Sequence, residues 1–322
     1  MKILILGGGG FIGGSLAARL KSEGHHIRIV DLKYHEFRPH HRIADQFIIG
    51  DLRDPEVVRW NLTPDIDFVF QLAADMGGAG YVFTGEHDAE IMHNSALINL
   101  NVAEVASVVL PKMLFYSSSA CMYPEYNQLD PNNPNCAENS AYPASPDSEY
   151  GWEKLFSERL YLAYRKRYGL NVKIARFHNI FGPYGTYRGG KEKAPAAMLR
   201  KAFLSKRDLE VWGDGQQTRS FLYIEDCLDA MLKLVYDQSF YGPVNIGSEE
   251  MVTINELAKL AIKISGRTDL QIKYVKGPVG VRGRCSDNKL IENKLDWKPR
   301  FNLHQGMQST ASWIGDQMGF TC

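Results

Sequence analysis

The feature that most constrains the fold is a glycine series that directly follows an apolar run near the start of the chain. Residues 3–6 are apolar, residues 7–10 are consecutive glycines, and Gly13 continues a three-residue spacing. Glycine permits a tight turn between a strand and a helix and lets the backbone approach a pyrophosphate, which the positive end of the helix attracts. The series therefore predicts a strand, a turn and a helix that bind a dinucleotide. The residues expected to contact it here are Gly7, Gly10, Phe11, Ile12 and Gly13.

The first half of the chain alternates short apolar runs with helical patterns. This alternation is typical of βαβ units, so we expect an α/β fold with a doubly wound parallel sheet, a Rossmann arrangement. The predicted strands are residues 2–6, 26–31, 46–50, 67–72, 112–118 and 171–176, and the predicted helices are 11–22, 88–109 and 150–168. Pro111 and Gly169 are expected to end the second and third of these helices.

The pattern changes after the sixth predicted strand, because glycine and proline crowd residues 182–190. The chain is expected to return to the sheet with residues 220–235 and 244–247, and then to form a helix at 254–265. We therefore predict two discontinuous parts. Residues 1–178 with 218–250 would form the cofactor-binding domain, and residues 179–217 with 251–322 would form a smaller substrate-binding lobe.

Acidic and polar residues after the predicted strands refine the expected dinucleotide site. Asp31 ends the second strand, 18 residues beyond the last glycine of the series, where a carboxylate accepts hydrogen bonds from the adenosine ribose. A carboxylate repels a 2′-phosphate, so Asp31 favours NAD over NADP, although Lys33 lies close. Asp51 and Leu52 are expected to flank the adenine, with a simple turn as the alternative for Asp51, and Ala73 is expected to contact the cofactor.

Charge and cysteine content exclude several function classes. The 37 Lys and Arg residues balance 37 Asp and Glu residues, so no overall positive field points to nucleic acid or an anionic membrane. The five scattered cysteines show no CxxC spacing, which favours a reducing, cytoplasmic compartment. Residues 3–18 are uncharged, but their glycines argue against a signal peptide. The nine histidines lack metal-ligand spacing, so no metal is predicted.

Tyr150 and Lys154 are four residues apart in a predicted helix, so their side chains share one face. An ammonium beside a phenol favours the phenolate, which makes Tyr150 a candidate acid and base near neutral pH. Tyr187 and Lys191 repeat the spacing in a glycine-rich stretch. Only the first pair follows the fifth predicted strand, whose carboxyl end lies where open α/β sheets bind ligands.

The glycine series, the SSSA stretch at 117–120 and the Tyr150-GWE-Lys154 motif together resemble the extended short-chain dehydrogenase/reductase family of nucleotide-sugar epimerases and dehydratases. This resemblance implies an NAD-dependent enzyme in which Ser119 helps to bind the reacting sugar oxygen. The 4,6-dehydratases of the family carry an acidic pair where this chain has Ala120 and Cys121, which disfavours a dehydratase.

Longer strings resemble one branch of that family, the epimerases of GDP-hexoses such as GDP-mannose. The strings are ADMGG at 74–78, SSACMYPE at 118–125, RFHNIFGPYGT at 176–186, GGKEKAPAA at 189–197, WGDGQQTRSF at 212–221, VNIGSEEMV at 244–252 and GVRGRCSDN at 280–288. The resemblance implies that Cys121 and Lys193 are acid/base groups on opposite faces of the sugar. Without it, Cys121 is typical of a small buried hydrophobe and Lys193 of a solvated surface lysine. If residues 119–121 are extended, Ser119 and Cys121 face the same way.

The same resemblance implies a set of substrate-binding residues. Gly77, Gly78, Glu125 and Asn179 join Ser119 and Lys193 in the sugar pocket, and Arg219, Arg282 and Arg284 are candidates for the diphosphate. Two arginines that lie two apart on an extended segment would face one way and could clamp a diphosphate, with a surface ion pair as the alternative for each. A homodimer through the helices at 88–109 and 150–168 is also implied by the family.

The expected chemistry follows from the weak acidity of a sugar C–H bond. Oxidation at C4 by bound NAD, with Tyr150 accepting the hydroxyl proton, would acidify the hydrogens at C3 and C5. The resemblance implies inversion at both carbons of GDP-mannose to give GDP-L-galactose, or at C5 alone to give GDP-L-gulose. The alternatives are another nucleotide-sugar epimerase or dehydratase, including one that acts on a GDP-heptose, and a non-catalytic protein that senses NAD.

Overall fold

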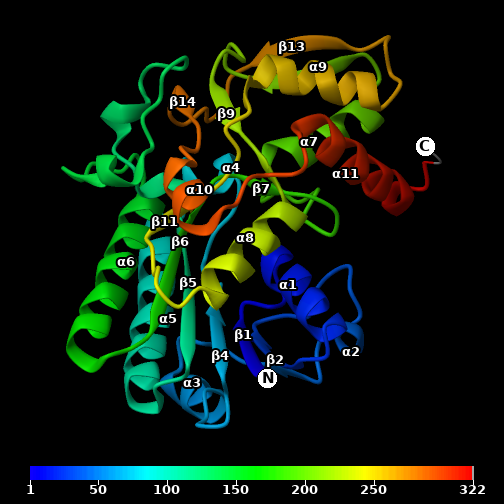
Figure 1. Cartoon of the computed structure of the whole chain (residues 1–322). Helices are drawn as coiled ribbons and strands as arrows, with labels where there is room; N and C mark the ends of the chain where they lie inside the picture. The colour runs from blue at the N-terminus through cyan, green and yellow to red at the C-terminus, as the bar shows by residue number, and fades with distance from the viewer. Residues whose placement is uncertain (321–322) are drawn as a thin grey trace.

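A seven-stranded parallel sheet forms the centre of the computed structural model, which describes residues 1–320 (Figure 1). The strand order is β3-β2-β1-β4-β5-β6-β11, so the winding direction reverses between β1 and β4. Open parallel sheets bind ligands beside such a reversal, outside the carboxyl ends of the strands. The strands are β1 (Lys2–Leu6), β2 (His26–Asp31), β3 (Gln46–Ile49), β4 (Phe68–Gln71), β5 (Met113–Ser119), β6 (Val172–Phe177) and β11 (Val244–Ile246). The doubly wound sheet expected from the sequence is thereby confirmed.

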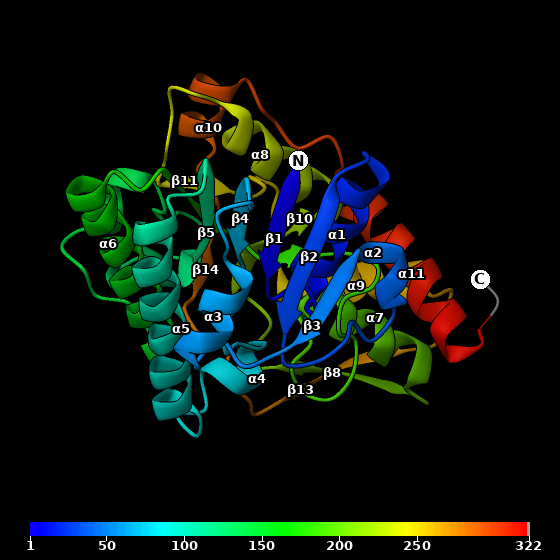
Figure 2. The same ribbon diagram turned by 90° about the horizontal axis from the view of Figure 1, so that it is seen from below.

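Both faces of the sheet are covered by helices, as the apolar strands require. Side chains of β1 alternate between the two cores: Ile3 and Ile5 pack on one face, whereas Leu4 and Leu6 pack on the other. Figure 2 shows α3, α5 and α6 on one side of the sheet and α1 and α8 on the other. These helices are α1 (Phe11–Ser22), α3 (Pro55–Asn61), α5 (Asp88–Val109), α6 (Glu149–Tyr168) and α8 (Ile224–Tyr236); the short α2 (His40–Ile43) and α4 (Ala79–Val82) lie in connections.

Two helix ends follow the predicted signals closely. Helix α5 stops at Val109, and Leu110 takes a left-handed conformation with φ 50° directly before Pro111. Helix α6 stops at Tyr168, and Gly169 takes the left-handed conformation at φ 73°, where its N–H caps the helix by donating to the Arg165 carbonyl. The expected ends at Pro111 and Gly169 are therefore confirmed.

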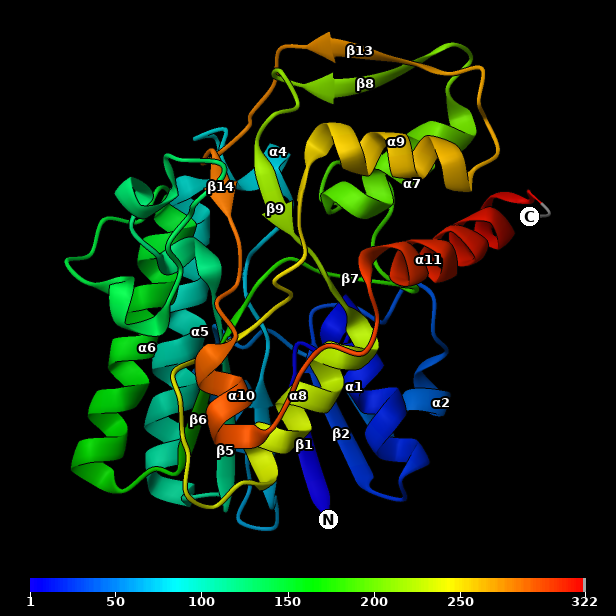
Figure 3. The same ribbon diagram turned by 45° about the horizontal axis from the view of Figure 1, so that its top comes forward.

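A second group of elements lies beyond the carboxyl ends of the sheet strands (Figures 1 and 3). In this group β9 pairs antiparallel with β12 and parallel with β14, and β8 pairs parallel with β13. The group also contains four helices. The elements are β7 (Ile180–Phe181), α7 (Ala194–Leu204), β8 (Asp208–Trp212), β9 (Thr218–Ser220), β10 (Leu222–Tyr223), β12 (Met251–Thr253), α9 (Ile254–Ile264), β13 (Gln271–Val275), β14 (Gly283–Arg284), α10 (Lys289–Leu295) and α11 (Leu303–Met318). Residues 182–190 contain no helix or strand, as predicted.

Within residues 1–320, no helix combines the length and the apolar character needed to cross a membrane. The cysteines of this part of the chain, at positions 121, 136, 227 and 285, are all free thiols, and Cys322 lies outside the described residues.

Candidate active site

A cavity of about 910 Å³ lies at the carboxyl edge of the sheet. One end is lined by the glycine turn after β1 and by Asp31, and the other end is lined by Trp212 and Gln217 from the second group of elements. The predicted catalytic residues lie along the wall between these ends, so one continuous space joins the expected cofactor site to the expected substrate site. The cavity is lined by Ser119, Cys121, Tyr150, Lys154 and Lys193.

The glycine turn has no room for side chains. Gly7 adopts φ +89°, and a Cβ added there would lie 2.6 Å from the Ala73 nitrogen. A Cβ on Gly13 would lie 2.3 Å from the Gly7 carbonyl oxygen. Gly10 caps the N-terminus of α1, whose free N–H groups favour a negatively charged group. All five glycine-turn residues predicted from the sequence, together with Ala73, line the cavity, so this cradle fits a pyrophosphate.

Asp31 stands at the end of β2 and fixes the same turn from the side. Its Oδ2 accepts a hydrogen bond from the Gly9 N–H at 2.9 Å, and its Oδ1 accepts one from the Lys33 N–H at 3.2 Å. Burial raises the pKa of Asp31, and these two N–H groups partly offset that effect. A carboxylate in this position can accept hydrogen bonds from a ribose diol, which fits the sugar of a dinucleotide.

The loop after β3 carries the two residues that the sequence predicts to flank the adenine, Asp51 and Leu52. Asp51 pairs with Arg53, whose Nη2 lies 2.6 Å from Oδ2, and this interaction lowers the pKa of Asp51. The Asn101 amide donates to the Leu52 carbonyl at 3.0 Å and to the Arg53 carbonyl at 2.9 Å, which holds the loop against α5. Asp51 and Leu52 both line the cavity.

Tyr150 and Lys154 lie on the first turns of α6, which begins after Ser148. The Ser148 hydroxyl caps the helix by accepting from the Gly151 N–H at 3.3 Å. The Lys154 Nζ lies 5.7 Å from the centre of the Tyr150 ring and donates to the Ser117 carbonyl at 3.0 Å. The spacing therefore brings both side chains to one face, as predicted.

The expected lowering of the Tyr150 pKa by Lys154 does not occur in this structure. Burial raises the pKa of Tyr150, because the nearly enclosed ring has little solvent to stabilise a phenolate. Burial also lowers the pKa of Lys154. The hydrogen bond from Lys154 goes to the Ser117 carbonyl, and the Ser119 hydroxyl and Arg284 lower the pKa of Tyr150 by less than burial raises it.

The second tyrosine and lysine pair has a different environment. Tyr187 is 4% exposed and packs edge-on against Trp313, with ring centroids 5.6 Å apart. Lys191 lies over the Tyr81 ring, with its Nζ 3.7 Å from the ring centre. The two side chains do not share a helix face, because residues 187–191 form no helix.

Cys121 reaches the cavity by a turn and not by an extended strand. A 3₁₀ helix (Ala120–Met122) follows β5, and the Ser119 hydroxyl accepts a hydrogen bond from the Cys121 N–H at 3.2 Å. The condition under which Ser119 and Cys121 would face the same way, an extended backbone, is therefore not met after Ser119, because the Ser119 side chain caps a tight turn. Both side chains nevertheless line the cavity.

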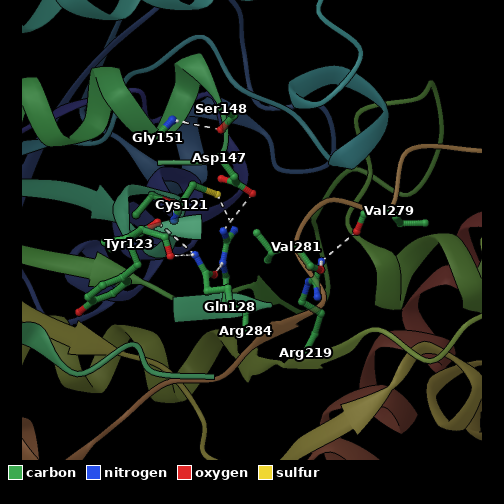
Figure 4. A network of polar contacts seen from close by, with 12 residues as sticks. Cys121, Tyr123, Gln128, Asp147, Ser148, Gly151, Arg219, Val279, Val281 and Arg284 are labelled. Carbon is green, nitrogen blue, oxygen red and sulfur yellow. Dashed lines mark hydrogen bonds and ion pairs between the residues drawn. The ribbon is translucent and has the colours of Figure 1, made fainter. Parts of the chain in front are cut away.

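Arg284 contacts Cys121 directly (Figure 4). Its Nη1 donates to the Cys121 Sγ at 2.9 Å, its Nε to the Gln128 Oε1 at 2.5 Å, and its Nη2 to the Asp147 Oδ2 at 3.3 Å. Burial lowers the pKa of Arg284, but the Cys121 and Asp147 groups more than offset it and raise the net value. Arg284 is therefore a buried cation with three fixed partners.

Lys193 approaches the cavity from another loop. It precedes α7, and its Nζ donates to the Gly77 carbonyl at 3.2 Å. The loop carrying Lys193 contacts the segment after β4, because the Gly78 N–H donates to the Lys191 carbonyl at 3.1 Å. A Cβ on Gly78 would lie 2.3 Å from the Glu192 carbonyl oxygen, so this close approach requires glycine. Burial lowers the pKa of Lys193.

The three predicted diphosphate arginines lie in three different environments. Arg282 is a partly exposed partner of Asp214 and does not line the cavity, whereas Arg284 is buried beside Cys121. Arg219 lines the cavity and donates to the carbonyls of Thr218, Val279 and Val281 at 2.7, 3.0 and 2.7 Å. Burial lowers the pKa of Arg219 to about 10.

The remaining predicted substrate residues are divided between the cavity and the surface. Gly77, Gly78 and Asn179 line the cavity, and the Asn179 amide donates to the Ser220 carbonyl at 2.9 Å. Glu125 is exposed and lies outside the lining. Within residues 1–320, no three His, Cys, Asp or Glu side chains are placed to hold a metal ion.

Three residues that no sequence pattern had singled out lie at the site. Gln128 and Asp147 hold Arg284, and Gln217 lines the far end of the cavity with a buried Oε1 that has no hydrogen-bond partner. Gln217 stands in the WGDGQQTRSF string, two residues before Arg219, so that string could have indicated it. Gln128 and Asp147 carry no local signal, because their roles depend on a residue more than 130 positions away.

Comparison with known proteins places the chain in a family. The sequence model described as the NAD dependent epimerase/dehydratase family matches residues 3–247. The chain is 45% identical over 318 residues to GDP-mannose 3,5-epimerase of Arabidopsis thaliana, covering 99% of this chain and 83% of that protein. GDP-mannose 3,5-epimerase 1 of Oryza sativa subsp. indica is also 45% identical, with 99% and 82% covered.

Solved structures agree in fold. UDP-glucose 4-epimerase of Thermotoga maritima, crystallised with UDP-glucose, matches with a TM-score of 0.87 at 24% identity and covers 99% of this chain and 100% of that chain. UDP-glucose 4-epimerase of Thermus thermophilus, in complex with NAD, matches with a TM-score of 0.81 at 21% identity, covering 98% and 99%. With the sequence match over residues 3–247, the chain is an enzyme of the NAD dependent epimerase/dehydratase family.

Proposed function

We propose that this enzyme is a GDP-mannose 3,5-epimerase, which converts GDP-mannose to GDP-L-galactose and releases GDP-L-gulose when only C5 inverts. The observation that carries the proposal is the composition of one cavity. The Tyr150 and Lys154 pair shares it with two further proton carriers, Cys121 and Lys193. A 4-epimerase needs no such second set, because it only removes and returns hydrogen at C4. The 45% identity to the Arabidopsis thaliana epimerase supports the same substrate.

The cofactor half of the cavity would hold NAD, with the pyrophosphate on the glycine turn and the adenosine ribose on Asp31. When bound, NAD supplies the reversible oxidation of the C4 alcohol, so that the reaction has no net redox change. Tyr150 accepts the C4 hydroxyl proton, and Ser119 hydrogen bonds to the same oxygen. Residues 1–178 with 218–250 would form this cofactor-binding domain, and the rest of the chain would form the substrate-binding lobe.

The other half of the cavity would move protons at the carbons beside the C4 ketone. The ketone acidifies the C3 and C5 hydrogens, since the electron pair of a broken C–H bond delocalises onto the C4 oxygen. In each inversion one group forms an S–H or N–H bond as the C–H bond breaks, and the other group returns a proton to the opposite face. Cys121 and Lys193 come from different loops of the cavity wall, which suits attack from two sides.

The far end of the cavity would bind the nucleotide. Arg219 is bonded only to backbone carbonyls, so its positive charge has no carboxylate partner among its hydrogen bonds and suits a diphosphate. The Trp212 ring and the free Oε1 of Gln217 offer a stacking surface and a hydrogen-bond acceptor to a base. Guanine carries ring and amino N–H donors that match this acceptor.

The test is to incubate the enzyme with GDP-mannose in deuterated water and locate deuterium in the products by NMR. Deuterium at both C3 and C5 is the expected result, and products without deuterium at either carbon would exclude the proposal. Cys121→Ala should abolish the exchange while the protein still retains NAD, whereas an Arg282→Gln control should exchange normally because this side chain lies outside the cavity. A panel of other GDP-hexoses, a GDP-heptose and UDP-sugars separates the related epimerases.

We also propose that the enzyme is a cytoplasmic homodimer. The free thiols at positions 121, 136, 227 and 285 suit a reducing compartment. Helices α5 and α6 expose large apolar side chains, including Leu100, Val108, Trp152 and Phe156. Such side chains on adjacent helices suit burial against a second copy of the chain.

A further inference from the structure

The Arg284 guanidinium lies between three side chains: the carboxylate of Asp147, the amide of Gln128 and the sulfur of Cys121. Arg284 is 4% exposed, and Gln128 behind it is completely buried. The side chain of Gln128 is itself fixed, because its Nε2 donates to the carbonyls of Tyr123 and Pro124, each at 3.1 Å. Its Oε1 is thereby directed at the Arg284 Nε. Gln128 therefore fixes Arg284 on this side, and Figure 4 shows the guanidinium facing Cys121.

Asp147 holds the Arg284 guanidinium on the other side. It is about as buried as Arg284, with side-chain exposures of 5% each, and its Oδ2 contacts Nη2 at 3.3 Å. Each of the three guanidinium nitrogens is therefore assigned to a different partner, and the one directed into the cavity contacts the Cys121 Sγ. Because a guanidinium stays charged, the sulfur has a permanent cation at 2.9 Å.

We propose that Gln128 and Asp147 are positioning residues that hold Arg284 against Cys121, so that Arg284 stabilises negative charge on the sulfur that accepts a proton. The inference rests on the proposed function and assigns Arg284 to the proton-transfer step. Arg219, whose hydrogen bonds reach only carbonyls, remains the arginine for the diphosphate.

The charges of Arg284 and Asp147 have opposite effects on the sulfur. Other groups also interact electrostatically with Cys121 and are the same in both variants below: Tyr150, Lys154, Lys193, Arg219 and Cys136. Arg284 stabilises the thiolate, and loss of its charge favours the thiol. Asp147 is a second anion that shares the same cation, so its charge disfavours the thiolate. Asp147→Asn keeps an oxygen acceptor for Nη2 but removes the negative charge, so the cation remains in place and its attraction is left to the sulfur.

The experiment measures iodoacetamide alkylation of Cys121 against pH, using peptide mass spectrometry to separate it from the other thiols. In Arg284→Gln the midpoint of this profile should move up by about 1 to 3 pH units, which is roughly a tenfold or greater loss of alkylation rate at neutral pH. In Asp147→Asn the midpoint should move down by about 0.5 to 1 pH unit. Arg282→Gln, two residues away and outside the cavity, is the matched control and should leave the midpoint unchanged.

Opposite shifts in the two variants, with native circular dichroism, support the proposed action of Arg284 on Cys121. General damage to the site would instead move both profiles the same way. The inference is overturned if Arg284→Gln leaves the midpoint unchanged, or if both variants shift in one direction. Alkylation needs no turnover, so the wild-type deuterium experiment judges the proposed function separately. Deuterium exchange in the wild type, without the expected alkylation shifts in the variants, would reject only this inference. The alkylation shifts without deuterium exchange in the wild type would reject only the proposed epimerase activity.

Discussion

The ammonium nitrogen of Lys154 donates to the carbonyl oxygen of Ser117 at 3.0 Å, which ties the catalytic helix α6 to the last residues of strand β5. The Lys154 side chain is nearly enclosed, and its Nζ also lies 5.1 Å from the Tyr116 ring centre. A long, flexible side chain is thereby held in one conformation beside Tyr150. This arrangement positions the cation without a carboxylate partner in its hydrogen bonding, so its charge remains available to the cofactor and to the phenol.

Lys154→Met should lower kcat by about 100-fold or more, because it removes the cation that acts with the acid/base tyrosine. The comparison variant is Lys191→Met, which alters the other tyrosine and lysine pair, and it should retain more than about a tenth of the activity because Lys191 is an exposed partner of Tyr81. Steady-state rates with GDP-mannose test both, and circular dichroism reports folding. Equal losses in the two variants would contradict the choice of Tyr150 and Lys154.

Much of the sheet could be predicted from the sequence, because its signals are local. The ends of β1 and β2 and of helices α1 and α5 agree with the predicted ranges, since buried parallel strands are apolar runs and glycine or proline punctuates the helices. The second group of elements was harder to predict. Strand β9 pairs with β12 and β14, which are short segments from distant parts of the chain, and such pairing leaves little periodicity.

The active site shows the same division. The glycine turn and the Tyr150 and Lys154 spacing are local patterns, so the sequence indicated them directly. The contact between Arg284 and Cys121 joins residues 163 positions apart, and only the fold could reveal it. The tight turn after Ser119 could not be predicted either, because a serine at the end of a strand is compatible with both an extended and a turned backbone.

Gly13→Ala should abolish NAD retention, because its new Cβ would lie 2.3 Å from the Gly7 carbonyl oxygen and would push the turn away from α1. The control is Gly24→Ala at the opposite end of α1, where no atom lies within 4 Å but φ is +84°. This variant should lose about 1 kcal/mol of stability and still retain NAD. Absorbance of the heat-released cofactor after purification measures retention, and a full complement of NAD in Gly13→Ala would show that the turn tolerates a side chain.

The paired substitutions Val108→Glu and Phe156→Glu should convert the proposed dimer to a monomer near 36.3 kDa, because they place charges among the exposed apolar side chains of α5 and α6. Val108 is 80% exposed and Phe156 is 46% exposed, so neither substitution opens a cavity in the core. Trp60→Glu on α3, at 70% exposure, is the matched control and should remain dimeric. Light scattering after size exclusion gives the masses, and a wild-type monomer at micromolar concentration would remove the dimer proposal.

His178 should make the folded protein less stable in acid. The imidazole is completely buried outside the cavity, with its Nε2 2.9 Å from the Asn245 Oδ1, and burial lowers its pKa from 6.5 to about 3. Between these two pKa values the His178 imidazole is protonated in the unfolded chain but neutral in the folded chain. Its contribution to stability is therefore complete above pH 6.5 and is lost as the pH falls toward 3. The loss from this one group amounts to about 2 kcal/mol between pH 7.5 and 5.

His178→Gln should therefore unfold more easily at pH 7.5 than the wild type, because it repacks a buried site, but its free energy of unfolding should fall less by pH 5. Urea unfolding at the two pH values gives the difference for each protein, and the surface substitution His41→Gln serves as the control that keeps the wild-type difference. If His178→Gln and wild type lose the same free energy on acidification, the imidazole is not held neutral by burial, and the lowered pKa is wrong.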